Sequence, residues 1–123
     1  MTSTTPHTVL IVEDEEDLRE MMREALQMKG YSVVTAEEGE DALRKLDDIG
    51  RPCLILMDLL MPGMNGWDLF EKLRQRPELA TVPVIVHSSA SDRAPSGVTR
   101  VLQKNLAFDR LISVVREYCA NAN

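Results

Sequence analysis

Three acidic side chains follow apolar runs of strand length, where they could bind a metal ion. Asp58 comes directly after the apolar run 54–57, and Glu13 and Asp14 follow the run 9–12. In a doubly wound α/β sheet, the ends of the first and third strands lie beside the switch point where ligands bind. Carboxylates held close together repel one another unless a cation neutralises them, and Mg²⁺ prefers oxygen ligands. The pattern predicts a Mg²⁺ site.

A hydroxyl and an amine stand after two further apolar runs. Ser88 follows the run 82–86 after a single intervening histidine, and Lys104 follows the segment 98–103. Phosphoryl transfer to a carboxylate needs a nucleophile, a metal and fixed donors for the transferred group. The sequence offers each type of group at the end of an expected strand.

The elements that must hold these groups alternate between strand and helix patterns. Apolar runs predict five strands, and helical apolar spacing separates most of them; the runs are 9–12, 31–36, 54–57, 82–86 and 98–103. Such alternation predicts parallel βαβ units and an α/β fold of three layers, with helices on both faces of the sheet. Between Ser89 and Val98 the connection is so short that we expect a shortened or irregular fourth helix.

Composition predicts one soluble domain. The chain has 123 residues, 44% of them hydrophobic, and its 14 basic against 20 acidic residues give a net charge of −6. That balance argues against nonspecific binding to nucleic acid or to an anionic membrane. We expect a flexible tail over 1–8, a domain over 9–119 and a tail over 120–123. No leader, membrane span or fused DNA-binding domain is expected, and the predicted location is cytoplasmic.

Two further residue types are interpreted as structural. Cys53 begins a buried strand and Cys119 lies on the terminal helix, a spacing that suggests neither a metal site nor a disulfide framework. Both are predicted to be reduced thiols. His87 falls inside the fourth strand and is predicted to be a neutral, hydrogen-bonded structural residue.

The segment around the central acid resembles a known family. Residues 57–66 read Met-Asp-Leu-Leu-Met-Pro-Gly-Met-Asn-Gly, which is similar to the phosphoacceptor segment of bacterial response-regulator receiver domains of the stand-alone, chemotaxis-receiver type. The likeness extends over about the whole chain. It implies a five-stranded parallel sheet of flavodoxin-like order 2-1-3-4-5.

The resemblance also implies a role for each polar group. Asp58 would be the phosphorylated nucleophile and a metal ligand, and Asp14 a direct metal ligand. Glu13 would act through water, and Leu60 belongs to the expected metal set. Ser88 would donate its hydroxyl to the phosphoryl group, and Lys104 would bring a compact positive charge.

Two positions depart from the family pattern. Receivers usually have proline after the lysine, whereas Asn105 follows Lys104 here, so we expect a trans peptide bond. Receivers also commonly place an aromatic residue three positions before the lysine, where this chain has Val101.

The resemblance implies that the protein is not an enzyme but a phosphoacceptor in two-component phosphorelay signalling. Its expected partners are a sensor histidine kinase or histidine phosphotransfer protein and an unknown downstream protein, with no nucleic acid and no membrane. The alternative is a phosphorylation-independent pseudo-receiver that acts as a protein-interaction module.

Overall fold

The computed structural model describes residues 8–103 and 108–119, the side chain of Ser91 excepted, and contains one parallel sheet. The strand order is β2-β1-β3-β4-β5, as the flavodoxin-like prediction requires. The strands are β1 Thr8–Val12, β2 Ser32–Ala36, β3 Leu54–Met57, β4 Val84–Ser88 and β5 Arg100–Gln103. The first strand thus begins at Thr8, one residue earlier than expected.

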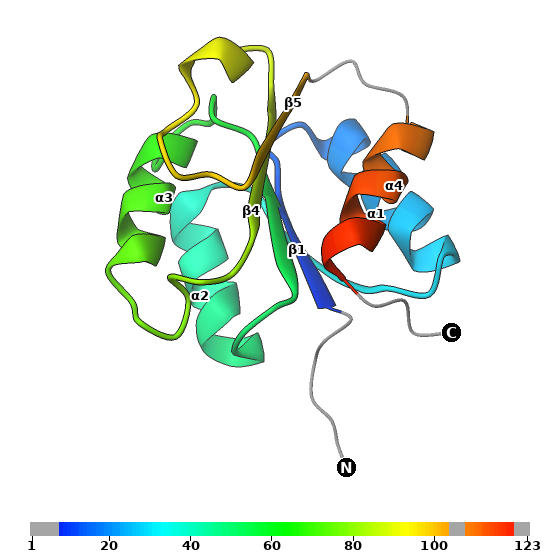
Figure 1. The fold of residues 1–123 in the computed structure, drawn as a ribbon, viewed down its shortest axis with the longest axis horizontal. Helices are drawn as coiled ribbons and strands as arrows, with labels where there is room; N and C mark the ends of the chain where they lie inside the picture. The colour runs from blue at the N-terminus through cyan, green and yellow to red at the C-terminus, as the bar shows by residue number, and fades with distance from the viewer. Residues whose placement is uncertain (1–7, 104–107, 120–123) are drawn as a thin grey trace.

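Within the described residues, four α-helices cover the two faces of the sheet. They are α1 Glu16–Met28, α2 Gly39–Ile49, α3 Gly66–Arg74 and α4 Phe108–Tyr118. In Figure 1, α2 and α3 lie on one side of the sheet, and α1 and α4 lie on the other. Each pair buries its own apolar cluster against the strands, which gives the predicted three layers. None of the described helices is long and apolar enough to cross a membrane.

The three central strands are buried along their whole length, because helices cover both of their faces. Their register aligns Val12 with Met57 and Met57 with Val86. Residues that follow these positions therefore emerge at one edge of the sheet. Glu13 and Asp58 are such residues, so the apolar runs position the acidic groups.

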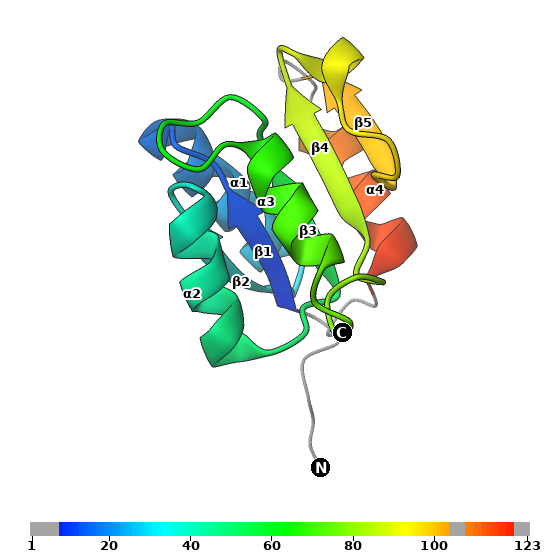
Figure 2. The same ribbon diagram turned by 90° about the vertical axis from the view of Figure 1, so that its left-hand side faces the viewer.

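The segment between β4 and β5 contains a single turn of 3-10 helix, Ser91–Arg93, which confirms the expected shortened fourth helix. It packs against α3 and is fastened at two points: Trp67 Nε1 donates to the carbonyl of Arg93 at 2.8 Å, and Arg74 donates to the carbonyl of Ser96 at 3.2 Å. Figure 2 shows this segment beside the upper end of β4. Hydrogen bonds from α3 side chains to main-chain carbonyls thus hold this segment against α3, in the absence of a full helix.

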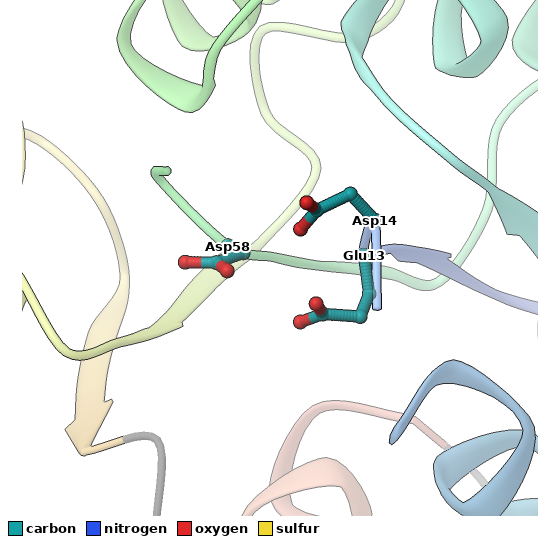
Figure 3. Close-up of side chains that lie close together, drawn as sticks. All are labelled: Glu13, Asp14 and Asp58. Carbon is teal, nitrogen blue, oxygen red and sulfur yellow. The ribbon is translucent and has the colours of Figure 1, made fainter. Parts of the chain in front are cut away.

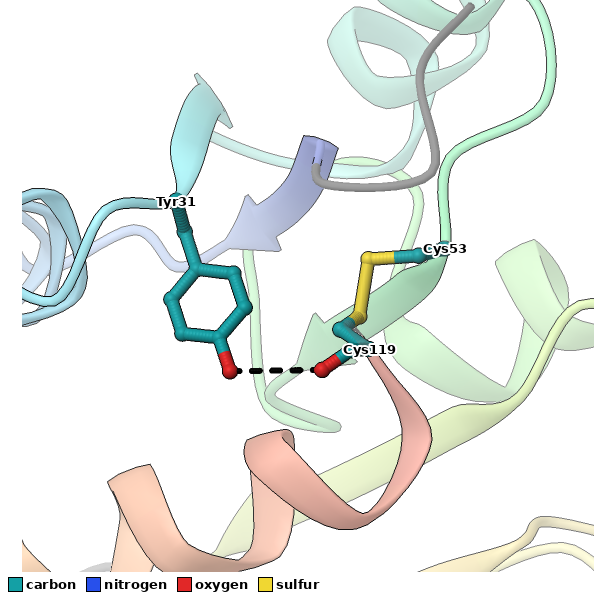
Figure 4. Close-up of a disulfide and its surroundings, with 3 residues drawn as sticks. All are labelled: Tyr31, Cys53 and Cys119. Carbon is teal, nitrogen blue, oxygen red and sulfur yellow. Dashed lines mark hydrogen bonds between the residues drawn. A yellow bond between two sulfur atoms is a disulfide. The ribbon is translucent and has the colours of Figure 1, made fainter. Parts of the chain in front are cut away.

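The prediction of two reduced thiols is wrong, because Cys53 and Cys119 form a disulfide in the structure (Figure 4). The two residues are 66 positions apart in sequence, yet their Cα atoms are 5.5 Å apart. Helix α4 runs back along the sheet, so its last residues reach the beginning of β3. Tyr31 also meets this point, since its hydroxyl donates to the carbonyl of Cys119 at 3.3 Å. Spacing along the chain gave no sign of this proximity.

Candidate functional site

Three carboxylates meet at the carboxyl edge of the sheet, as the sequence predicted. Glu13, Asp14 and Asp58 each offer an oxygen, and these oxygens lie within 4.8 Å of one another (Figure 3). Glu13 is 0% exposed and Asp58 is 1% exposed, whereas Asp14 is exposed. The cluster is therefore embedded in the protein and open to solvent on the Asp14 side.

The backbone fixes Asp58 on several sides. Its N–H donates to the carbonyl of Val12 at 3.0 Å, which joins the ends of β1 and β3. Its Oδ1 accepts hydrogen bonds from the N–H groups of Leu59 at 2.7 Å and Leu60 at 3.3 Å. These contacts set the direction of the carboxylate and leave Oδ2 as the oxygen not engaged by those two amides.

The loop after Asp58 closes on itself and requires a glycine. The N–H of Gly66 donates to the carbonyl of Leu59 at 3.0 Å. A Cβ atom at Gly66 would lie 2.6 Å from the carbonyl oxygen of Asp58 and 2.7 Å from the Cα of Leu59, too close for any other residue without a backbone shift. Asn65 caps α3 by accepting the N–H of Asp68 at 2.9 Å, as predicted.

Glu38 ties this loop to the neighbouring helix, a role that sequence reasoning missed. Its Oε1 accepts the N–H of Glu40 at 2.8 Å and the N–H of Met64 at 3.3 Å. The N–H of Gly39 also donates to the carbonyl of Met64 at 3.0 Å. An acid before a helix indicates a capping residue, but the second contact depends on the fold.

Glu13 is held at both its side chain and its main chain. Its Oε2 accepts the N–H of Glu15 at 2.9 Å, and its carbonyl accepts a hydrogen bond from Arg19 at 2.9 Å. Its Oε1 lies 3.6 Å from Nε2 of His87, within ion-pair distance. His87 is therefore next to the acidic cluster, where the sequence suggested only a structural residue in the strand.

The remaining expected site residues differ in how the structure places them. Ser88 is fully buried at the end of β4, and its Oγ accepts the N–H of Ala90 at 3.1 Å. Leu60 is 46% exposed, and its side chain has no atom that binds metals, so only its main-chain carbonyl could be a ligand. Lys104 and its bond to Asn105 lie outside the described residues.

The donor set suits a hard divalent cation. Within the described residues, the clustered groups are all carboxylates, and oxygen ligands favour Mg²⁺ or a related ion over softer metals. Two carboxylates buried this close together repel one another, and a cation between them would offset that repulsion. The arrangement can thus hold a metal ion beside the fixed carboxylate of Asp58.

Comparison with known proteins identifies the family. Residues 9–116 match the family described as the response regulator receiver domain. The chain belongs to this family. The receiver domain is 36% identical over 85 residues to the transcriptional regulatory protein CpxR of Escherichia coli K12, a match covering 69% of the chain and 36% of CpxR. It is 34% identical over 86 residues to the phosphate regulon transcriptional regulatory protein PhoB of Rhizobium meliloti, a match covering 70% of the chain and 37% of PhoB. The matches thus span about a third of these relatives.

Solved structures show the same fold over nearly the whole receiver domain. A putative response regulator from Chloroflexus aurantiacus has a TM-score of 0.84 and 31% identity, covering 93% of this chain and 98% of that one. Response regulator TrrA from Thermotoga maritima, solved in complex with Mg²⁺-BeF, has a TM-score of 0.79 and 30% identity, covering 90% and 97%. Chemotaxis response regulator CheY4 of Vibrio cholerae has a TM-score of 0.80 and 26% identity, covering 94% and 99%.

Two features of this receiver domain differ from the common family pattern within the described residues, and the expected trans bond after Lys104 lies outside them. Val101 on β5 is 41% exposed, so an aliphatic side chain stands at the surface where receivers commonly carry an aromatic one. The 3-10 turn at Ser91–Arg93 replaces a full helix on the same side of the molecule as α3.

Proposed function

We propose that this receiver domain accepts a phosphoryl group on Asp58 from a sensor histidine kinase or a histidine phosphotransfer protein. The observation that carries the proposal is a buried carboxylate, oriented by two backbone N–H groups, beside two further carboxylates. In the transfer, a carboxylate oxygen of Asp58 forms a bond to phosphorus as the bond between phosphorus and the donor's histidine nitrogen breaks. The imidazole leaves with the electron pair of that bond.

We assign the Mg²⁺ site to Glu13, Asp14, Asp58 and the main-chain carbonyl of Leu60. The bound ion would neutralise charge on the oxygens of the transferred group. The backbone N–H groups of Leu59 and Leu60 hold Asp58 in place, so little reorganisation is needed when it reacts. Ser88, whose Oγ accepts the N–H of Ala90, would donate its hydroxyl hydrogen to the phosphoryl group, and Lys104 would supply a positive charge.

The proposed role is that of a phosphoacceptor, with proteins as partners on both sides of the relay. The downstream partner is a protein, because a net charge of −6 opposes binding to nucleic acid or an anionic membrane. With these partners, the proposed location of the domain is the cytoplasm. Its expected range of 9–119 is extended by Thr8, which is the first residue of β1. Cellular reductants keep most thiols reduced in the cytoplasm. A disulfide between Cys53 and Cys119 that persists in cells would therefore argue against this location.

The proposal is tested by intact mass after incubation with acetyl phosphate. We expect the wild-type protein to gain one phosphoryl group with Mg²⁺ and none with a chelator in its place. Circular dichroism under both conditions shows that the fold is retained. A folded protein that binds Mg²⁺ and gains no mass would support the pseudo-receiver alternative instead.

A second prediction concerns the lifetime of the phosphorylated state. Leu60 lies two residues after the acceptor, is 46% exposed and cannot orient a water molecule for attack on phosphorus. We expect Leu60→Asn to accelerate loss of phosphate about tenfold, the effect of roughly 1.4 kcal/mol of help in the transition state. The measurement is first-order decay of the phosphorylated mass after removal of acetyl phosphate.

Leu60→Met is the matched control, because it keeps an apolar side chain of similar volume. We also expect Ala90, two residues after Ser88, to flank the attacking water. It is 4% exposed and packs in the core, so a polar residue there would disturb the fold as well. A decay rate that is the same in Leu60→Asn and in the wild type would contradict the prediction.

A further inference from the structure

His87 is a buried polar residue on the side of the sheet covered by α1 and α4. It is 4% exposed, and most of the side chains that line the hollow beside it are apolar. The hollow that it lines is formed mostly by apolar side chains of α1, β5 and α4, namely Leu18, Met22, Leu102, Phe108 and Leu111. An imidazole buried there loses hydration, so it must gain a compensating contact to be tolerated.

One such contact in the structure is with Glu13. His87 Nε2 lies 3.6 Å from Glu13 Oε1, and both side chains are almost completely buried. The separation is longer than a direct N–H···O bond, so the two groups are at ion-pair distance, and a direct hydrogen bond would need one of the side chains to rotate. Glu15 holds the other oxygen of the same carboxylate through its N–H. Among the described residues, each oxygen of the Glu13 carboxylate thus has a polar neighbour.

We propose that His87 is a positioning residue for Glu13, setting the direction in which this carboxylate faces the proposed Mg²⁺ site. The inference rests on the proposed function, because it assumes that the site binds Mg²⁺. Groups that orient the ligands of a metal commonly alter its affinity by 10–100-fold when they are replaced. Packing alone does not call for an imidazole here, because a leucine would fill the same apolar surroundings without a polar group to bury.

The test compares the wild type with His87→Leu and His87→Gln by Mg²⁺ titration in a calorimeter. We expect His87→Leu to bind Mg²⁺ about 10–100-fold more weakly. We expect His87→Gln to stay within a few-fold of the wild type, because its amide N–H can still donate to Glu13. Equal affinity in the wild type and His87→Leu would overturn the proposal. So would a loss in His87→Gln as large as that in His87→Leu, since packing would then explain both.

A second measurement needs no metal. The chain has two histidines, so a His7→Gln background leaves one imidazole for ¹⁵N NMR. We expect the proton on Nε2, facing Glu13, and a shift of that signal in Glu13→Gln. An imidazole spectrum unchanged by Glu13→Gln would overturn the positioning role. If the wild type binds no Mg²⁺, the proposed metal site fails, while the NMR result still decides whether His87 and Glu13 are coupled.

Discussion

Replacing Asp58 with asparagine should abolish phosphoryl uptake while leaving the fold intact. An amide oxygen is a poor nucleophile toward phosphorus, and the change also removes a negative charge from the metal site. Asparagine has nearly the same shape as aspartate, and its Oδ1 can accept the same N–H groups of Leu59 and Leu60. The expected result is no mass gain from acetyl phosphate and Mg²⁺, with an unchanged circular dichroism spectrum.

Asp68→Asn is the matched control for that experiment. It makes the same chemical change at an exposed position in the first turn of α3, outside the acidic cluster. We expect it to be phosphorylated like the wild type. Phosphoryl uptake by Asp58→Asn at the wild-type rate would mean that another residue is the acceptor.

The largest expected effect on stability comes from the disulfide. Cys53 and Cys119 close a loop of 66 positions in sequence, and the chain-entropy relation for a loop of this length gives about 4 kcal/mol. We expect the double variant Cys53→Ala/Cys119→Ala to lose about 2–5 kcal/mol of unfolding free energy relative to the oxidised wild type. Urea unfolding, followed by the fluorescence of Trp67, the one tryptophan, measures the loss.

The reduced wild type is the control, because it keeps both side chains and lacks only the bond. We expect its stability to lie near that of the double variant. A thiol assay on the denatured, unreduced protein should detect no free thiol. Two free thiols, or equal stability with and without reductant, would contradict a stabilising disulfide. The same assay on protein taken rapidly from cells would show whether the bond persists in the proposed compartment.

Much of the fold follows from local patterns in the sequence. The run 54–57 is predicted and found as β3, because four buried apolar residues between a proline-containing break and an acid are typical of a central strand. Asn65 is predicted and found as the cap of α3. The short connection before β5 is predicted from its length and its Pro95 and Gly97, and it forms only one 3-10 turn.

Features that depend on distant contacts were not predicted. The bond between Cys53 and Cys119 arises because α4 runs back to the start of β3, and chain spacing does not reveal this geometry. The contact between His87 and Glu13 joins β4 to the end of β1 across β3. Strand order can place the two residues at one edge, but side-chain direction decides whether they meet.

Part of the site does follow from strand order. Once β1 and β3 are adjacent, Asp14 and Asp58 must emerge at neighbouring points, and their grouping with Glu13 is confirmed. The roles of Ser88, Lys104 and Leu60 rest on the family pattern and stay predictions. For Lys104 the described residues add nothing.

The most direct test of the phosphoacceptor assignment is to locate the modified residue. An aspartyl phosphate is an acyl phosphate, which borohydride reduces to homoserine, leaving a permanent mark at the acceptor. The protein is treated with acetyl phosphate and Mg²⁺, reduced, digested and sequenced by mass spectrometry. We predict homoserine at position 58 and nowhere else. Homoserine at Asp14 or at any other carboxylate, with residue 58 still aspartate, would contradict the account.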